Sequence, residues 1–206
     1  MIEEFVHDVE AHTYEFRGQR VISITDTLAD QGFVDYSRIP ASVREVALAC
    51  GREVAKATQL LDEGRLQWSS LRETVEWEGK TYTWTLGRVL AYVEFKREFQ
   101  FKPIVREQPF YDPTYGYAGR PDCFGETAYG PATVQLKAGP VEPWVGLQTA
   151  AEARLFSLAG YESQKRIGVQ LRADGTFKAT WFKDSMGDLR IFLSALACSK
   201  WRMNNR

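Results

Sequence analysis

The stretch from Gly116 to Leu155 constrains the fold more than any other part of the chain, because strand patterns are followed there by a helix pattern. It begins with GYAGRPDCFGE, passes through a Tyr-Gly-Pro turn signal and continues with ATVQLKAG. The last of these segments alternates polar and apolar residues, which is typical of a strand with one face on the core. Gln135 and Lys137 are therefore expected on one face, and Val134 and Leu136 on the other.

Two short strands and then an amphipathic helix are expected in the first third of the chain. Aromatic and β-branched residues flank Gly18, which predicts a turn between two strands that lead into a polar helical start. Further on, Ser42 and Glu45 have the spacing of a capping box. Apolar residues then recur every three or four positions over residues 43–61. This helix is expected to end near Gly64.

The remaining segments predict a second helix, three strands, a third helix, a hairpin and a final helix. The three strands, IVREQPFY, YAGRPDCFGE and ATVQLKAG, are expected to be neighbours in one sheet. The other expected elements are a helix over 85–99 with Leu86, Val89, Leu90 and Val93 inward, a helix over 147–159 with Leu147, Ala151, Leu155 and Leu158 inward, a hairpin over 166–171 and 177–182, and a helix after Ser185 with Leu189, Phe192, Leu193, Leu196 and Trp201 inward.

This order of elements predicts an α/β or α+β sandwich, with helices flanking a central mixed sheet. The chain has 206 residues and 44% hydrophobic content, which is enough for one sizeable core. No Pro/Gly/Ser-rich linker divides the sequence. We therefore expect a single domain over residues 1–206.

The composition limits the compartment and the partners. A net charge of -1 neither excludes nor supports nucleic-acid binding, so any basic groove must be local. The three cysteines lie far apart without CxxC spacing, which argues against a disulfide framework and structural zinc. The first residues are acidic and no run approaches about 20 apolar residues, so neither secretion nor membrane insertion is expected. A cytoplasmic location fits best.

The order GRPD, VQLK and a helix beginning near Gln148 resembles the core of the PD-(D/E)XK nuclease superfamily, in particular its phage-encoded, RecB-like exonuclease branch. The segments HTYEFRGQRVISITDTL and ALACGREVAKAT resemble the front and the first core helix of that branch, so the resemblance covers most of the chain. It implies a restriction-endonuclease-like core, DNA as the partner, Mg²⁺ or Mn²⁺ as cofactor, and the host cytoplasm as the location if the protein is phage-encoded.

The resemblance also implies roles for individual residues. Asp122 would be the metal-binding aspartate, Leu136 would offer its backbone carbonyl to the metal, and Lys137 would orient water or phosphate. Gln148 matches the glutamine at the start of the helix that distinguishes the RecB-like branch, and Gln135 occupies the position of the second acid. Such a site hydrolyses a phosphodiester because a carboxylate-held Mg²⁺ neutralises charge and activates water.

Three positions depart from the pattern. Gln135 replaces the acid, Ala55 replaces a histidine metal ligand after the valine of the first core helix, and Glu152 stands where the branch commonly has an aromatic residue. An amide keeps an oxygen for the metal but removes a full charge, so metal binding is expected to weaken. Glu107 lies where many relatives keep an acid, and is expected to approach the metal or a basic neighbour.

Simpler interpretations stand beside these assignments. Asp122 and Lys137 on adjacent strands can form an ordinary cross-strand ion pair. His7 and His12 are spaced for a surface or turn role rather than for metal binding, and Cys123 is expected as a packed core thiol. The following basic residues are candidates either for a DNA-facing surface or for solvated charge interleaved with acids: Arg17, Arg20, Lys96, Arg97, Lys102 and Arg106.

Three functions remain open at the level of sequence. The first is a phage-type DNA-processing nuclease with an atypical metal site, and the second is a catalytically inactive pseudo-nuclease that binds DNA or a protein partner. The third is a globular protein unrelated to nucleic acid. Restoring Glu at Gln135 and His at Ala55 separates the first two, because a disabled site in an intact scaffold would gain metal-dependent cleavage.

Overall fold

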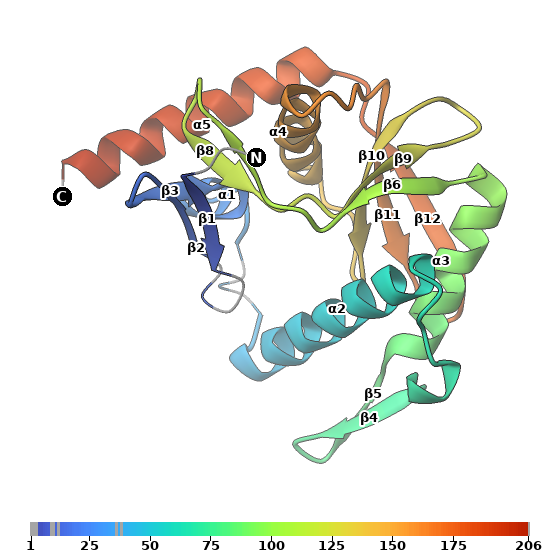
Figure 1. Ribbon diagram of the computed structural model, residues 1–206. Coiled ribbons are helices and arrows are strands. Elements are labelled where there is room, and N and C mark those ends of the chain that lie inside the picture. Colours follow the sequence, from blue (N-terminus) through green and yellow to red (C-terminus); the bar gives the residue numbers. More distant parts are fainter. Residues whose placement is uncertain (1–3, 9–10, 12, 36, 38, 206) are drawn as a thin grey trace.

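This computed structural model has a mixed α/β fold (Figure 1). It describes residues 4–8, 11, 13–35, 37 and 39–205. Its helices cover both faces of a curled five-stranded sheet, which agrees with the predicted central mixed sheet. The elements are β1 (Phe5–Asp8), β2 (Thr13–Phe16), β3 (Gln19–Ser23), α1 (Ile24–Asp30), α2 (Ala41–Asp62), η1 (Trp68–Ser70), β4 (Thr74–Trp77), β5 (Lys80–Thr83), α3 (Thr85–Phe99), β6 (Lys102–Arg106), β7 (Phe110–Asp112), β8 (Tyr117–Gly119), β9 (Cys123–Glu126), β10 (Ala132–Lys137), α4 (Val145–Leu158), β11 (Lys165–Leu171), β12 (Phe177–Trp181) and α5 (Ser185–Asn204).

The central sheet has the order β12-β11-β10-β9-β6. β10 and β11 are parallel and are connected through α4, whereas the other neighbouring pairs are antiparallel. Alternation along β10 is as predicted: Val134 is fully buried in the core formed with α2 and α3, and Leu136 packs against that core. Gln135 contacts Asp122 and Lys137 contacts α4, away from that core.

The prediction that IVREQPFY and YAGRPDCFGE are continuous strands of one sheet is wrong. Each segment is divided between two sheets, because β7 and β8 join a second sheet of order β1-β2-β3-β8-β7, while β6 and β9 stay in the central one. Strand alternation is a local signal and does not specify the partner strand. Asp122 consequently lies in the bend between β8 and β9 rather than within a strand.

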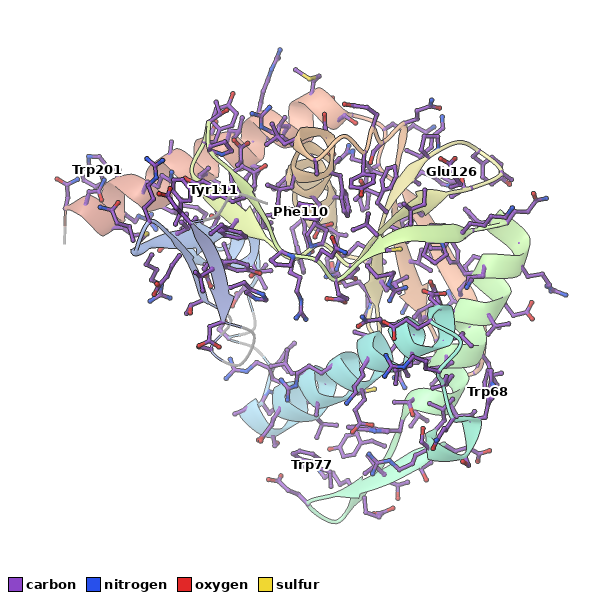
Figure 2. All side chains as sticks on the ribbon, viewed as in Figure 1. Trp68, Trp77, Phe110, Tyr111, Glu126 and Trp201 are labelled. Carbon is purple, nitrogen blue, oxygen red and sulfur yellow. The ribbon has the colours of Figure 1, made fainter. Side chains whose placement is uncertain are left out.

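The helices begin and end close to their predicted bounds, but not every residue that was expected to face inward does so. Leu90, Leu158 and Trp201 are exposed rather than inward-facing, and Trp201 projects near the end of α5 (Figure 2). The predicted capping box is also wrong: Ser42 lies inside α2, whose N-cap is Pro40 with no side-chain cap. A proline at this position fixes the backbone for helix entry without a polar cap.

The hairpin β4–β5 is an element that the sequence analysis did not predict. Its turn is formed by Glu78 and Gly79, both with positive φ (49° and 73°), as a two-residue hairpin turn requires. The pattern TVEW-EG-KTYT was therefore a readable signal. Figure 1 shows the hairpin extending from α3, and Val75, Trp77 and Tyr82 partly pack against the main core.

The described residues form two large hydrophobic cores and a smaller third one. One large core lies between α2, α3 and the central sheet. The other large core gathers α1, α4 and α5 beneath β3 and β8, with Leu28, Tyr117, Leu155 and Phe192 almost fully buried. Within the described part of the chain, no helix is both long and apolar enough to cross a bilayer. The arrangement brings the ends of β3 and β10, the start of α4 and the length of α2 around one opening.

Candidate functional site

A cleft of about 920 Å³ contains every position that the family resemblance assigned to the site. Its lining comes from α2, from the ends of β3 and β10, from the bends around Glu107 and Asp122, and from the first turns of α4. The predicted positions within it are Ala55, Glu107, Asp122, Gln135, Leu136, Lys137, Gln148 and Glu152. Residues from five separate segments of the sequence therefore meet at one place.

Asp122 is held against β10 by two hydrogen bonds to the same oxygen. The backbone N–H of Leu136 donates to Asp122 Oδ2 at 2.7 Å, and Gln135 Nε2 donates to it at 2.6 Å. The carbonyl of Asp122 accepts from the backbone N–H of Glu107 at 3.2 Å, which fixes the bend itself. Gln135 thus occupies the position of the expected acid and uses its amide to hold the neighbouring carboxylate.

A chain of hydrogen bonds connects β10 with α4 on the same side of the sheet. Lys137 Nζ donates to Gln148 Oε1 at 3.1 Å, and Gln148 Nε2 donates to Glu152 Oε1 at 2.8 Å. Lys137 Nζ also lies 5.0 Å from the centre of the Trp144 ring, a cation–π distance. Gln148 and Glu152 are 5% and 2% exposed. These contacts orient the ammonium group of Lys137 at the cleft.

Three carboxyl groups of the cleft, Glu107, Asp122 and Glu152, are called the cleft acids below. Burial, together with the negative charge of Asp122, raises the pKa of Glu107 to about 7, although Arg120 pairs with Glu107 at 2.9 Å. Burial, followed by the charge of Asp122, raises the pKa of Glu152 well above its usual range. Burial also raises the pKa of Asp122, against the opposing charge of Lys137. The site therefore favours added positive charge.

Two buried oxygens in the cleft accept no hydrogen bond: Gln135 Oε1 and Glu152 Oε2. A buried polar atom without a partner is unusual and identifies a place where a ligand can supply the missing interaction. From the sequence, Glu152 was noted only as a departure from the family pattern, and neither it nor Arg120 or Tyr14 was predicted as a site residue. Its spacing of four from Gln148 was the available signal, because it places both side chains on one face of α4.

The oxygens present suit a hard cation such as Mg²⁺. Asp122 offers a carboxylate, Gln135 offers the unpartnered amide oxygen, and Glu107 lies beside them, which matches the usual preference for one or two carboxylates completed by water. Among the residues that the structure describes, no group of three or more His, Cys, Asp or Glu side chains forms a metal-binding set. Carboxylate and amide oxygens such as these would leave the remaining positions around a Mg²⁺ ion to water.

The other candidates of the sequence analysis lie outside this arrangement. Cys123 is fully buried in the core, as expected, and burial raises the pKa of its thiol. His7 does not lie in a turn: it belongs to β1 and stacks on Tyr14, with ring centres 4.6 Å apart. His12 lies outside the described residues. Arg106 is not part of a DNA-facing surface, because its side chain is 9% exposed and pairs with Asp62.

The remaining basic candidates differ in whether they pair with an acid. Lys96 also pairs with Asp62, Arg17 pairs with Glu4, and Arg97 pairs with Glu94. These contacts match the expectation of charge interleaved with acids. Arg20 and Lys102 are exposed.

Compared with models of known protein families and with curated proteins, the chain matches none.

Proposed function

We propose that the chain is a phage-type DNA-processing protein with a PD-(D/E)XK nuclease fold, and that its cleft hydrolyses phosphodiester bonds with Mg²⁺ or Mn²⁺. The observation that carries this proposal is the convergence of Asp122, Gln135, Lys137 and Gln148 in one cleft. Gln135 and Lys137 share one face of β10, and an accidental resemblance would not be expected to bring Asp122 and Gln148 from other segments to that face. The central mixed sheet, with helices on both faces, also agrees with the architecture that the resemblance implies.

In this proposal, the residues that the resemblance assigned to the site have separate roles. Asp122, Gln135 Oε1 and the Leu136 carbonyl would hold the ion, which neutralises phosphate charge and makes bound water a better nucleophile. Lys137 positions the attacking water or a phosphate oxygen, and Gln148 fixes the direction of its ammonium group. Glu107 accepts a proton near neutral pH, since its pKa is about 7.

A second candidate, a pseudo-nuclease that binds DNA or a protein partner without cleaving DNA, is favoured by a different observation. Gln135 donates to Asp122 at 2.6 Å, so the Asp122 carboxylate is stabilised by the protein in the absence of a cation. A glutamate at this position would instead need a cation between the two carboxylates. Ala55 on the α2 wall of the cleft likewise supplies no ligand.

The test is cleavage of end-labelled linear and circular DNA, single- and double-stranded, with Mg²⁺ or Mn²⁺. Lys137→Ala is the matched control, because it removes the ammonium group and leaves the metal-binding oxygens in place. Cleavage by the natural sequence that is lost in Lys137→Ala supports the nuclease. Binding without cleavage, together with cleavage gained by Gln135→Glu with Ala55→His, supports the pseudo-nuclease; no binding at low salt contradicts both.

A further inference from the structure

A second hollow, of about 460 Å³, lies at the opposite end of the central sheet from the cleft. Its walls come from the loop between β9 and β10, the start of β11, the end of β12 and the segment before α5. Gln164 and Lys165 donate their backbone N–H groups to Pro131 at the start of β10, whereas Lys137 of the cleft ends that strand. Six residues of β10 therefore separate the two sites by about 20 Å.

Two exposed aromatic rings form a corner in this hollow, which is called the ring corner below. The rings of Trp181 and Tyr129 are 5.3 Å apart at an interplanar angle of 88°, and Trp181 stacks on Phe99 at 5.7 Å. Tyr129 is 53% exposed and Trp181 is 37% exposed. Phe99 supports both rings from below, since it also contacts Tyr129 edge to face at 5.5 Å. The corner is thus packed on the core through Phe99 and is also open to solvent.

The charge beside the ring corner is positive. The lining includes Lys165, Arg166 and Lys183 and no acidic residue, in a chain whose net charge is -1. The buried guanidinium of Arg166 is already occupied by Asp188, Gly146 and Ser185. Lys165 and Lys183 are exposed, and within the described part of the chain neither forms an ion pair.

Two acids that lie close in sequence to this lining already have other partners. Asp184 caps α5 by accepting from the backbone N–H of Gly187 at 2.8 Å, and Asp188 pairs with Arg166 at 2.7 Å. The cleft differs in this respect, because its lining holds five carboxylates and four basic side chains. An anionic ligand is therefore favoured at the ring corner without a divalent cation, and is not favoured in the cleft without one.

From this combination we infer that the ring corner is a metal-independent binding site for single-stranded nucleic acid. An unpaired base stacks on the Trp181 face against the Tyr129 wall, and the flanking phosphates contact Lys165 and Lys183. The volume suits a small ligand group rather than a duplex, whose base faces are covered by stacking. Gln164, exposed on the rim, supplies hydrogen bonds to a base edge.

The test is fluorescence anisotropy of labelled oligo(dT) and oligo(U), each twelve nucleotides long, titrated with the full chain in EDTA over a salt series. Tyr129→Ala and Trp181→Leu should each weaken binding about tenfold, the usual effect of losing one stacked base. Tyr129→Phe keeps the ring and should bind like the natural sequence. Because Tyr129 lies in an exposed loop, its variants test the site even if Trp181→Leu unfolds.

The lysines are tested by charge reversal. Lys165→Glu with Lys183→Glu should weaken binding more than tenfold and reduce the slope of log K against log salt by about 1.4, the value for two phosphate contacts on a single strand. The control pair Lys56→Glu with Lys80→Glu changes the net charge equally at exposed positions outside the hollow. Equal loss of binding in both pairs would show a net-charge effect only and overturn the inference.

Failure of this inference is distinguishable from failure of the proposed nuclease function. A chain that cleaves DNA with Mg²⁺ but binds neither oligonucleotide in EDTA overturns the site at the ring corner and leaves the nuclease standing. A chain that binds in EDTA through Tyr129 and Lys165 but never cleaves supports the site and removes the nuclease. A comparison of oligo(dU) with oligo(U), which differ only in the 2′-hydroxyl group, identifies which sugar the site accepts.

Discussion

Two clusters of acidic and basic side chains in this molecule are built in opposite ways. In the first, the single carboxylate of Asp62 accepts from Tyr92 at 2.7 Å and from Arg106 at 2.7 Å, and it also pairs with Lys96. In the second, the three cleft acids share Arg120 and Lys137, and one oxygen each of Gln135 (Oε1) and Glu152 (Oε2) accepts no hydrogen bond. The first cluster has more basic than acidic side chains, and the second has more acidic than basic ones.

This difference distinguishes polar side chains that stabilise the fold from polar side chains that are available for a function. The Asp62 cluster joins the end of α2 to α3 and β6, so its contacts hold the sheet against the helices. The cleft acids raise one another's pKa and make the folded chain less stable when they are ionised. Proteins retain such arrangements where a ligand or a reaction supplies the missing charge. Substitutions that remove one charge at a time test this difference between the two clusters.

The largest effect on stability is expected from Asp62→Asn. This change keeps the shape of the side chain but leaves Arg106 and Lys96 without their counter-charge, and the Arg106 side chain is only 9% exposed. Breaking a buried pair in this way costs about 3–5 kcal/mol. Urea unfolding at neutral pH measures it, with the neighbouring exposed Glu63→Gln as control, expected within about 0.5 kcal/mol. Similar small changes in both variants would mean that the Asp62 cluster does not stabilise the fold.

The second-largest effect is expected from Gln135→Glu. The new carboxylate would lose the hydrogen bond to Asp122 and face it with like charge, which should cost about 2–3 kcal/mol in EDTA. If the cleft holds a divalent ion, Mg²⁺ at 100 times its Kd should restore about 2.7 kcal/mol. Thermal unfolding with EDTA or Mg²⁺ measures both effects independently of cleavage. Gln135→Met, which removes only the oxygen at this position, is the control and should respond less to Mg²⁺ than Gln135→Glu.

Much of the fold could be predicted because the signals are local. The helix at 85–99 and the hairpin of β11 and β12 follow directly from periodicity and from the Asp174-Gly175 turn. The division of residues 104–126 between two sheets could not be predicted in this way, since partner choice depends on contacts between distant segments. Leu158 and Trp201 were expected to be inward for a related reason: periodicity identifies a helix face but not how far the core extends along it.

In the candidate site, too, the residues that could be predicted are those with a local sequence signal. Asp122 and Lys137 were recognisable from their motifs, and the alternation of β10 predicted that Gln135 and Lys137 share a face. Glu152 was not recognisable as part of the site, because a charged residue in the middle of a helix normally lies in solvent. Only the packing of α4 against the sheet shows that this carboxyl is 2% exposed.

The third prediction uses Glu152 to sharpen the contrast with Asp62: Glu152→Gln should stabilise the chain by about 1–2 kcal/mol at pH 8. Because the folded-state pKa of Glu152 is raised, its favourable contribution is complete below the unfolded pKa and is lost as pH rises. The gain on substitution should therefore be small at pH 4.5 and grow towards pH 8. Chemical unfolding at both pH values measures it. Destabilisation at pH 8 would show that the ionised carboxylate has a partner in the folded chain.

The smallest effect concerns the ion pair between Arg120 and Glu107, whose side chains are 30% and 12% exposed. A double-mutant cycle of Arg120→Gln and Glu107→Gln should give a coupling energy of at most about 1 kcal/mol at pH 8. At pH 5 the coupling should vanish, because Glu107, with a pKa of about 7, is then protonated and has no charge for Arg120 to stabilise. A coupling that persists at pH 5 would mean that the ion pair with Arg120 keeps Glu107 ionised. The cleft would then resemble the Asp62 cluster, and its excess of negative charge would no longer distinguish it as the functional site.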